Sequence, residues 1–192
     1  MYQNLLCDEQ LLSLLLCCDR DLAEAARERG CPECGGRLHQ STFPRKPRGG
    51  PAQSDPQQAL RFSFCCCEDG CRHRVTPPSL RFLGRRVYLA TVMVLTQVLR
   101  SGASPARVSE LERLIGVSAR TLRRWRRWWQ TTFAASRFWQ AARGQLCDCL
   151  DPSELPHALL DRFCGDARAR LHGLLRFLSP ISGGAAAQEL AR

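Results

Sequence analysis

Pairs of cysteines with the spacing of metal-binding turns carry the clearest chemical signal in this sequence. Cys31 and Cys34 are separated by two residues and followed directly by Gly35 and Gly36. A turn of this kind aims two thiolates and several backbone amides at one point, and glycine supplies the positive φ that the turn needs. We interpret this motif as one half of a structural zinc site.

The second half lies in residues 65–71, where three consecutive cysteines precede Cys71. Cys66 is the preferred partner of Cys71 because it shares a strand face with the preceding phenylalanines, and Cys67 is the alternative. His73 is a further candidate ligand, although it also fits the basic run around it. The predicted site holds one structural Zn²⁺ through Cys31, Cys34, Cys66 and Cys71.

Four thiolates close the coordination sphere of zinc and leave no position for water, so such a site holds structure and performs no chemistry. Cys147, Cys149 and Cys164 are candidates for a second metal site, but no partner turn accompanies them. The sequence shows no nucleophile–base pair, phosphate-binding glycine loop or open metal site. We therefore expect a protein that is not an enzyme and has no small-molecule substrate.

A run of arginines and tryptophans follows Gly116 and predicts an amphipathic helix. Gly116 can end the preceding helix, and Ser118 is a good N-cap because its hydroxyl accepts a bond from a first-turn amide. At helical spacing one face is apolar: Leu122, Trp125, Trp129 and Phe133. The opposite face is basic: Arg120, Arg123, Arg124 and Arg127. No acidic residue occurs between 119 and 147, so this face suits a polyanion.

The whole chain of 192 residues carries a formal charge of +10, from 28 basic and 18 acidic residues, and Lys46 is its single lysine. Arginine favours bidentate contacts with phosphate and guanine, so nucleic acid is the expected partner. The N-terminal apolar run carries acids where an export signal has a basic start, and the apolar run 87–99 is too short to cross a bilayer. We expect a cytoplasmic, nucleoid-associated protein with no membrane contact.

Periodicity and turn residues divide the chain into four expected segments. Residues 1–30 form an N-terminal helical segment. Residues 31–78 form a zinc ribbon, with strands at 37–43 and 60–64. Residues 79–143 contain a basic connector and a helix-turn-helix DNA-binding domain, and residues 144–192 a C-terminal helical segment and tail. The fold class is therefore α+β, mostly α, with the zinc ribbon inserted between an N-terminal helix and a helix-turn-helix bundle.

Two finer expectations concern burial. The strand at 60–64 alternates apolar and polar residues, which predicts that its apolar side chains face a core and that Arg61 faces water. The first helix contains three cysteines among its leucines, which we interpret as small buried apolar residues: Cys7, Cys17 and Cys18.

The motif Cys31–Gly36, the pair Cys66 and Cys71, and the stretch Gly116–Trp129 together resemble the N-terminal DNA-binding part of bacterial insertion-sequence transposases. Those proteins pair a zinc ribbon with a helix-turn-helix, and the resemblance covers residues 30–135. The phrase Ile-Gly-Val-Ser-Ala-Arg-Thr-Leu-Arg-Arg-Trp looks like their recognition-helix entry. Two features depart from the family: the second cysteine pair is not Cys-x2-Cys, and no catalytic domain follows. The resemblance implies DNA binding in a mobile-element setting and does not imply strand transfer.

These observations predict sequence-specific binding of duplex DNA by a transposase-related or accessory protein of a mobile element. The helix that begins at Ser118 would enter the major groove, where its four arginines contact guanine edges or phosphates and Arg120 and Arg123 lie nearest the bases. Further basic residues would hold the DNA backbone: Arg45, Lys46, Arg48, Arg85 and Arg86.

The alternative is an RNA-binding or protein-docking module that partners a separate transposase or a second copy of the chain. Trp128 falls outside the apolar face of the arginine helix, so under this hypothesis we expect it to stack on a base or to pack on a partner.

Overall fold

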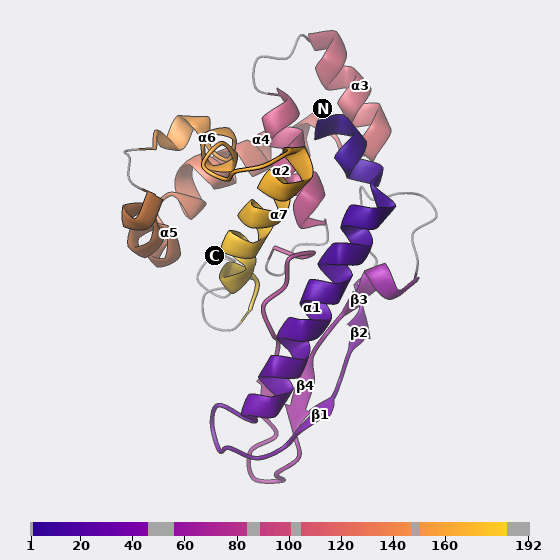
Figure 1. Cartoon of the computed structure of the whole chain (residues 1–192), viewed down its shortest axis with the longest axis vertical. Coiled ribbons are helices and arrows are strands. Elements are labelled where there is room, and N and C mark those ends of the chain that lie inside the picture. Colours follow the sequence, from indigo (N-terminus) through magenta and orange to yellow (C-terminus); the bar gives the residue numbers. More distant parts are fainter. Residues whose placement is uncertain (1, 46–55, 84–88, 101–104, 147–149, 184–192) are drawn as a thin grey trace.

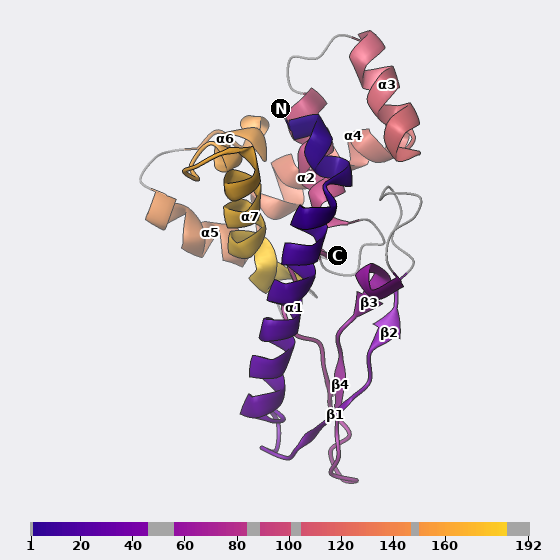
Figure 2. The ribbon, with the colours of Figure 1, turned by 45° about the vertical axis from the view of Figure 1, so that its right-hand side comes forward.

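The computed structural model describes residues 2–45, 56–83, 89–100, 105–146 and 150–183. The fold is mostly helical with a small antiparallel sheet, which confirms the predicted α+β class. A long helix, α1 (Glu9–Arg29), runs along the molecule from a helical body at one end to a β-module at the other (Figure 1). Turning the molecule keeps α1 between the strands and helix α7 (Ala167–Leu178) (Figure 2).

Helix α1 has the end signals that the physics of helices requires. Asp8 caps it by accepting a hydrogen bond from the backbone N of Leu11 at 3.0 Å, and Gly30 ends it with φ +76°. A short 3₁₀ helix, η1 (Tyr2–Cys7), precedes it. Leucines at helical spacing face the core, but Cys7 and Cys17 are exposed, so the expectation that they are buried was wrong. Cys17 lies on the polar side of α1, which burial of the leucines leaves in water, and Cys7 is the last residue of η1.

The β-module comprises the described residues of 31–78. Strands β1 (Leu38–Gln40), β4 (Phe64–Cys66) and β5 (Arg74–Val75) form an antiparallel sheet in the order β1-β4-β5. Strands β2 (Phe43–Pro44) and β3 (Leu60–Arg61) form a second antiparallel pair. The module's own buried cluster is small: Ala23 of α1, Cys31, Leu38, Phe64 and Cys66. So small a core needs additional cross-links to be stable.

The burial of residues 60–64 differs from the expected alternation. Arg61 is 1% exposed and Ser63 is 0% exposed, whereas Leu60 and Phe62 are only half-buried. Arg61 is covered because its guanidinium donates hydrogen bonds to the carbonyl oxygens of Pro77, at 2.5 Å, and Ser182, at 3.1 Å. Other parts of the chain therefore cover the polar side of this strand.

The helical body is built around α2 (Ala90–Arg100), whose residues 90–98 are all buried. It packs against α3 (Pro105–Ile115), α4 (Ala119–Trp128), α7 and η1. The remaining described elements are η2 (Pro56–Ala59), the π-helical turn η3 (Trp129–Phe133), α5 (Arg137–Ala142), η4 (Arg143–Leu146), η5 (Pro152–Glu154), α6 (His157–Leu160) and η6 (Ser179–Ser182). None of the described helices combines the length and the apolar character that crossing a membrane requires.

The described part of the connector between the β-module and the helical body is buried, although the sequence predicted a basic connector. All five described residues after Pro78, residues 79–83, are buried. Arg81 lies 2.8 Å from Asp19 of α1, with both side chains at most 1% exposed. The Ser79 hydroxyl and the Leu80 backbone N also donate to the Asp19 carboxylate, at 2.5 and 2.6 Å. One carboxylate thus binds three groups of the connector.

Arg81 extends the same network into the β-module. Its guanidinium donates to the backbone carbonyls of Gln57, Gln58 and Leu60 at 2.8–3.1 Å. Burial lowers the pKa of Arg81, and the charge of Asp19 opposes that shift. The Ser182 hydroxyl joins the C-terminal segment to this network by bonding the backbone of Ser79. Residues from α1, the β-module, the connector and the C-terminal segment therefore share one buried polar cluster.

Asp19→Asn should lower the free energy of unfolding by about 3–5 kcal/mol, because it leaves the buried guanidinium of Arg81 without its counter-charge. Chemical denaturation of the full chain measures this change. Asp21→Asn, two residues away on an exposed position of the same helix, should change stability by less than about 0.5 kcal/mol. Equal effects of the two substitutions would show that the buried pair does not hold the fold together.

Candidate metal centre and basic helix surface

Four cysteine sulfurs converge at the end of the β-module. The Sγ atoms of Cys31, Cys34, Cys66 and Cys71 all lie within 4.8 Å of one another. Cys31 and Cys71 are 3.7 Å apart, and Cys34 and Cys66 are 3.4 Å apart. Sulfurs bound tetrahedrally at the Zn–S distance of about 2.3 Å would be separated by roughly 3.8 Å. The cluster therefore has the size of a four-sulfur site for a single metal ion, and it comprises the four cysteines selected from the sequence.

The first pair is positioned by a turn directly after α1. The backbone N of Gly35 donates to the Cys31 carbonyl at 2.8 Å, and the backbone N of Cys31 donates to the Gly36 carbonyl at 2.9 Å. Gly30 and Gly35 have φ values of +76° and +72°, which other residues adopt only with strain. The second pair comes from β4 and the turn after it, which the Cys71 backbone N closes by donating to the Glu68 carbonyl at 3.0 Å.

Backbone amides support negative charge on the sulfurs. Burial alone would raise the pKa of Cys31, but the amides of Glu33 and Cys34 and the neighbouring thiols lower it to about 7. The Glu68 amide acts in the same direction on Cys66, but burial and three neighbouring thiols raise the pKa of Cys66 to about 12. Four adjacent sulfurs cannot all be deprotonated without a positive charge between them, and a bound cation supplies that charge.

The sequence left alternative ligands for the second pair, and the geometry separates them from the cluster. Cys65 points to the other side of β4, where its Sγ lies 3.6 Å from the Arg72 carbonyl oxygen. Cys67 Sγ lies 3.3 Å from the Glu68 carboxylate. His73 is not a member of the four-cysteine cluster, which is the single group of converging metal-ligand side chains within the described residues. Cys147 and Cys149 lie outside those residues, and Cys164 is exposed.

Gly36 forms part of the wall of this cluster. A Cβ atom at position 36 would lie 3.2 Å from the sulfurs of Cys34 and Cys66 and 2.7 Å from Cγ of Glu68. The backbone here lies close to the sulfurs because glycine has no side chain. The sequence shows two glycines after Cys34, and turn geometry accounts for the positive φ of the first. That the second, Gly36, must lack a side chain because it lies against the sulfurs became clear only from the structure.

Helix α4 presents a basic surface on the helical body. Its arginines are all exposed: Arg120, Arg123, Arg124, Arg126 and Arg127. The underside of α4 and of the following turn η3 is buried almost completely, with Leu122, Trp129 and Phe133 at 0% and Trp125 at 1% exposure. Within the part of the chain that the structure describes, none of these five arginine side chains forms a salt bridge or hydrogen bond. The positive charge of this surface is therefore not neutralised by the carboxylates of that part.

The entry to α4 has the expected caps. Ser118 is the N-cap, and its hydroxyl accepts a hydrogen bond from the Thr121 backbone N at 3.4 Å. Gly116 has φ +61°, which allows the sharp exit from α3. Helices α3 and α4 are thus joined by residues 116–118 alone, with α2 packed against both.

Trp128 is not available for stacking on a base. It is 7% exposed, and its ring packs edge-on against Trp129, with 4.9 Å between the ring centroids. The ring of Phe133 lies 5.7 Å away. The ideal helical wheel underestimated the apolar sector, because the rings of Trp129 and Phe133 in η3 pack against Trp128. Arg126 is exposed, like the four arginines named from the sequence.

The additional basic residues expected to hold DNA are mostly outside the described residues: Lys46, Arg48, Arg85 and Arg86. Arg45 is half-buried, with its guanidinium 5.9 Å from the ring centroid of Phe43 and 5.8 Å from that of Phe82. It contributes to packing between the β-module and the connector.

Comparison of the chain with protein-family models, with curated proteins and with solved structures finds no match. Inferences about function therefore depend on the geometry of the cysteine cluster and of the α4 surface.

Cys66→Ser should abolish stoichiometric metal binding, because it removes one of the four converging sulfurs. Cys65→Ser is the matched control on the same strand and should leave one ion per chain. Elemental analysis after purification, and the thiolate-to-metal absorption of the cobalt-loaded chain, measure the two variants. If Cys65→Ser lost the ion and Cys66→Ser kept it, the ligand set would be wrong.

Gly36→Ala should weaken metal binding at least about tenfold, because the added methyl group would displace sulfurs that must keep their distances within about 0.2 Å. Gly70→Ala in the same module is the control, since a methyl group there would meet no atom within 4 Å and the φ of Gly70 is not positive. Competition with a chromophoric chelator measures both affinities. Equal affinities of the two variants would contradict the close approach at position 36.

Proposed function

We propose that this chain binds duplex DNA in a sequence-specific manner through α4. The observation that carries the proposal is the surface of five exposed arginines without carboxylate partners in the described structure, fixed above a fully buried aromatic underside. Such a helix is rigidly held on one side and strongly positive on the other. A phosphate-lined groove is the polyanionic surface that an α-helix fits.

The arrangement of α2, α3 and α4 supports a helix-turn-helix. The tight connection at Gly116 and Ser118 joins α3 to α4, as the motif requires. With α4 in the major groove, Arg120 and Arg123 near its N-terminal end would read guanine edges. Arg124 and Arg127 would contact guanines or phosphates.

The four-cysteine cluster is proposed to be a zinc ribbon that holds one structural Zn²⁺. Four thiolates in a tetrahedral arrangement favour zinc over hard cations such as Mg²⁺ and Ca²⁺. Since the β-module has only a small buried core, the ion would supply a large part of its folding free energy. With all four positions taken by sulfur, the ion would have no open position for a substrate.

The setting that we propose is a mobile element, on the strength of the resemblance of the cysteine motif and the α4 entry to insertion-sequence transposases. The chain would act as an accessory DNA-binding protein, alone, with a second copy or with a separate transposase. The RNA-binding or docking alternative drew its specific support from an accessible Trp128, and that side chain is buried. Duplex DNA is therefore the better-supported partner.

Arg123→Ala should weaken binding to the preferred duplex by about 1–3 kcal/mol and relax discrimination at one base position, as loss of a bidentate guanine contact does. Fluorescence anisotropy with the preferred duplex and a set of single-base variants measures both effects. Arg143→Ala, an exposed arginine of η4 outside α4, is the matched control and should leave discrimination unchanged.

The salt dependence of binding distinguishes arginines that contact bases from arginines that contact only phosphates. An arginine that binds only phosphate should reduce the log–log slope by about 0.9 when it is removed, with equal loss for all sequences. If the Arg123→Ala variant bound every sequence as tightly as the parent chain, the proposed role of this surface would be contradicted.

A further inference from the structure

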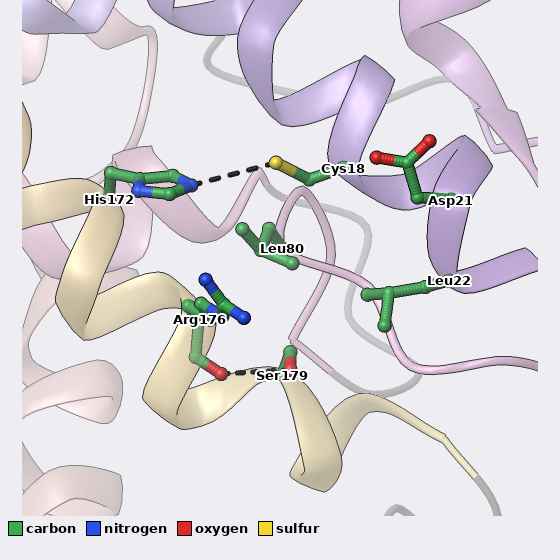
Figure 3. Close-up of a pocket in the computed structure, with 7 residues that line it drawn as sticks. All are labelled: Cys18, Asp21, Leu22, Leu80, His172, Arg176 and Ser179. Carbon is green, nitrogen blue, oxygen red and sulfur yellow. Dashed lines mark hydrogen bonds between the residues drawn. The ribbon is translucent and has the colours of Figure 1, made fainter. Parts of the chain in front are cut away.

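A cavity of about 330 Å³ lies between α1, the connector and α7, away from both sites described above. It is lined by Cys18, Asp21, Leu22, Leu80, His172, Arg176 and Ser179 (Figure 3). Its volume is near the lower end of the roughly 300–1,000 Å³ typical of small-molecule sites. The cavity thus has room for a compound of about the size of an amino acid and not for a large cofactor.

Two opposite charges face this cavity from different helices. Asp21 belongs to α1 and Arg176 to α7, and Leu80 of the connector lies between them (Figure 3). Neither side chain has a salt-bridge or hydrogen-bond partner within the described residues, and the two do not pair with each other. A cation-binding group and an anion-binding group are therefore separated by an apolar wall made of Leu80 and Leu22.

The remaining polar wall is a thiol–imidazole pair. Cys18 Sγ lies 3.6 Å from His172 Nε2. Burial and the charges of Asp21 and Asp19 raise the pKa of Cys18, while burial and Arg176 lower the pKa of His172. Both groups are therefore neutral at pH 7 and share one weak hydrogen bond. A neutral thiol is a poor nucleophile, so we assign this pair a structural role in joining α1 to α7. The charged groups that line the cavity are then Asp21 and Arg176.

We propose that this cavity binds a small zwitterion, with its carboxylate on Arg176, its ammonium group on Asp21 and its apolar stem against Leu80. The class that fits is an amino acid whose two charges are separated by several methylene groups. The bound molecule would link α1 and α7 next to the buried Asp19 network, because the Leu80 backbone N is one of the donors to Asp19. This site does not depend on the proposed DNA-binding function.

The test uses the metal-loaded full chain and a series of unbranched ω-amino acids from glycine to 8-aminooctanoate. Thermal unfolding detects binding, because a ligand of the folded state raises the midpoint, and calorimetry gives the affinity. We expect affinity to peak at one stem length. The alkylamine and the carboxylic acid of that same length should each bind more weakly, by up to about fivefold, the effect of losing one exposed ion pair.

Two exposed positions make the assignment specific. Arg176→Gln should bind the best ω-amino acid and its alkylamine analogue equally, because the carboxylate no longer has a partner. Asp21→Asn should instead bind the amino acid and its carboxylic acid analogue equally. Glu28→Gln, an exposed acid on the same α1 helix, and Arg143→Gln are the controls and should retain both preferences.

Two results would overturn the proposal. One is that no member of the series raises the unfolding midpoint or binds at about 10 mM, a concentration that would reveal even weak millimolar affinity. The other is that singly charged analogues bind as tightly as the zwitterion, since the opposed charges would then play no part.

Discussion

The buried carboxylate of Asp19 is the contact on which the remainder of the fold depends. It accepts hydrogen bonds from Ser79, Leu80 and Arg81, and Arg81 in turn binds three carbonyl groups of the β-module. An ion pair with both members desolvated is maintained only when its remaining hydrogen-bonding groups are also satisfied. Here these additional bonds come from different segments of the chain, so the pair fixes how the β-module is attached to the helical body.

This attachment gives the two ends of the molecule different physical roles. The β-module has too small a buried core to be stable alone, and its four converging sulfurs suit a bound metal ion. The helical body has a continuous core of leucines and tryptophans, and that core holds α4 with its arginines outward. A metal ion held by these sulfurs would therefore support the integrity of one end, while the proposed recognition of DNA concerns the surface of the other. The connector contacts both ends, so a structural change in the β-module would reach the helical body through it.

Features that depend on local spacing were predictable from the sequence, and features that depend on distant partners were not. The four cysteines could be selected because turn spacing and strand alternation constrain them, and Ser118 and Gly116 because caps are local. The burial of Arg81 had no local signal, since its partner Asp19 lies 62 residues earlier. Trp128 was misplaced for a different reason: the wheel assumes a regular α-helix, whereas the chain turns into the π-helical η3 directly after it and packs Trp129 and Phe133 against its ring. Asp21 and Arg176, which line the cavity, lie on α1 and α7, and only the folded structure shows that these two helices bring them to one cavity.

Selection of binding sites from a pool of random duplexes, by the metal-loaded full chain, tests the central claim most directly. If α4 recognises duplex DNA, one short motif should be enriched. That motif should be lost when Arg120, Arg123, Arg124 and Arg127 are replaced together by alanine in a chain that keeps its metal and its unfolding midpoint. Enrichment of no motif, or recovery of the same motif by the arginine-free variant, would contradict the claim.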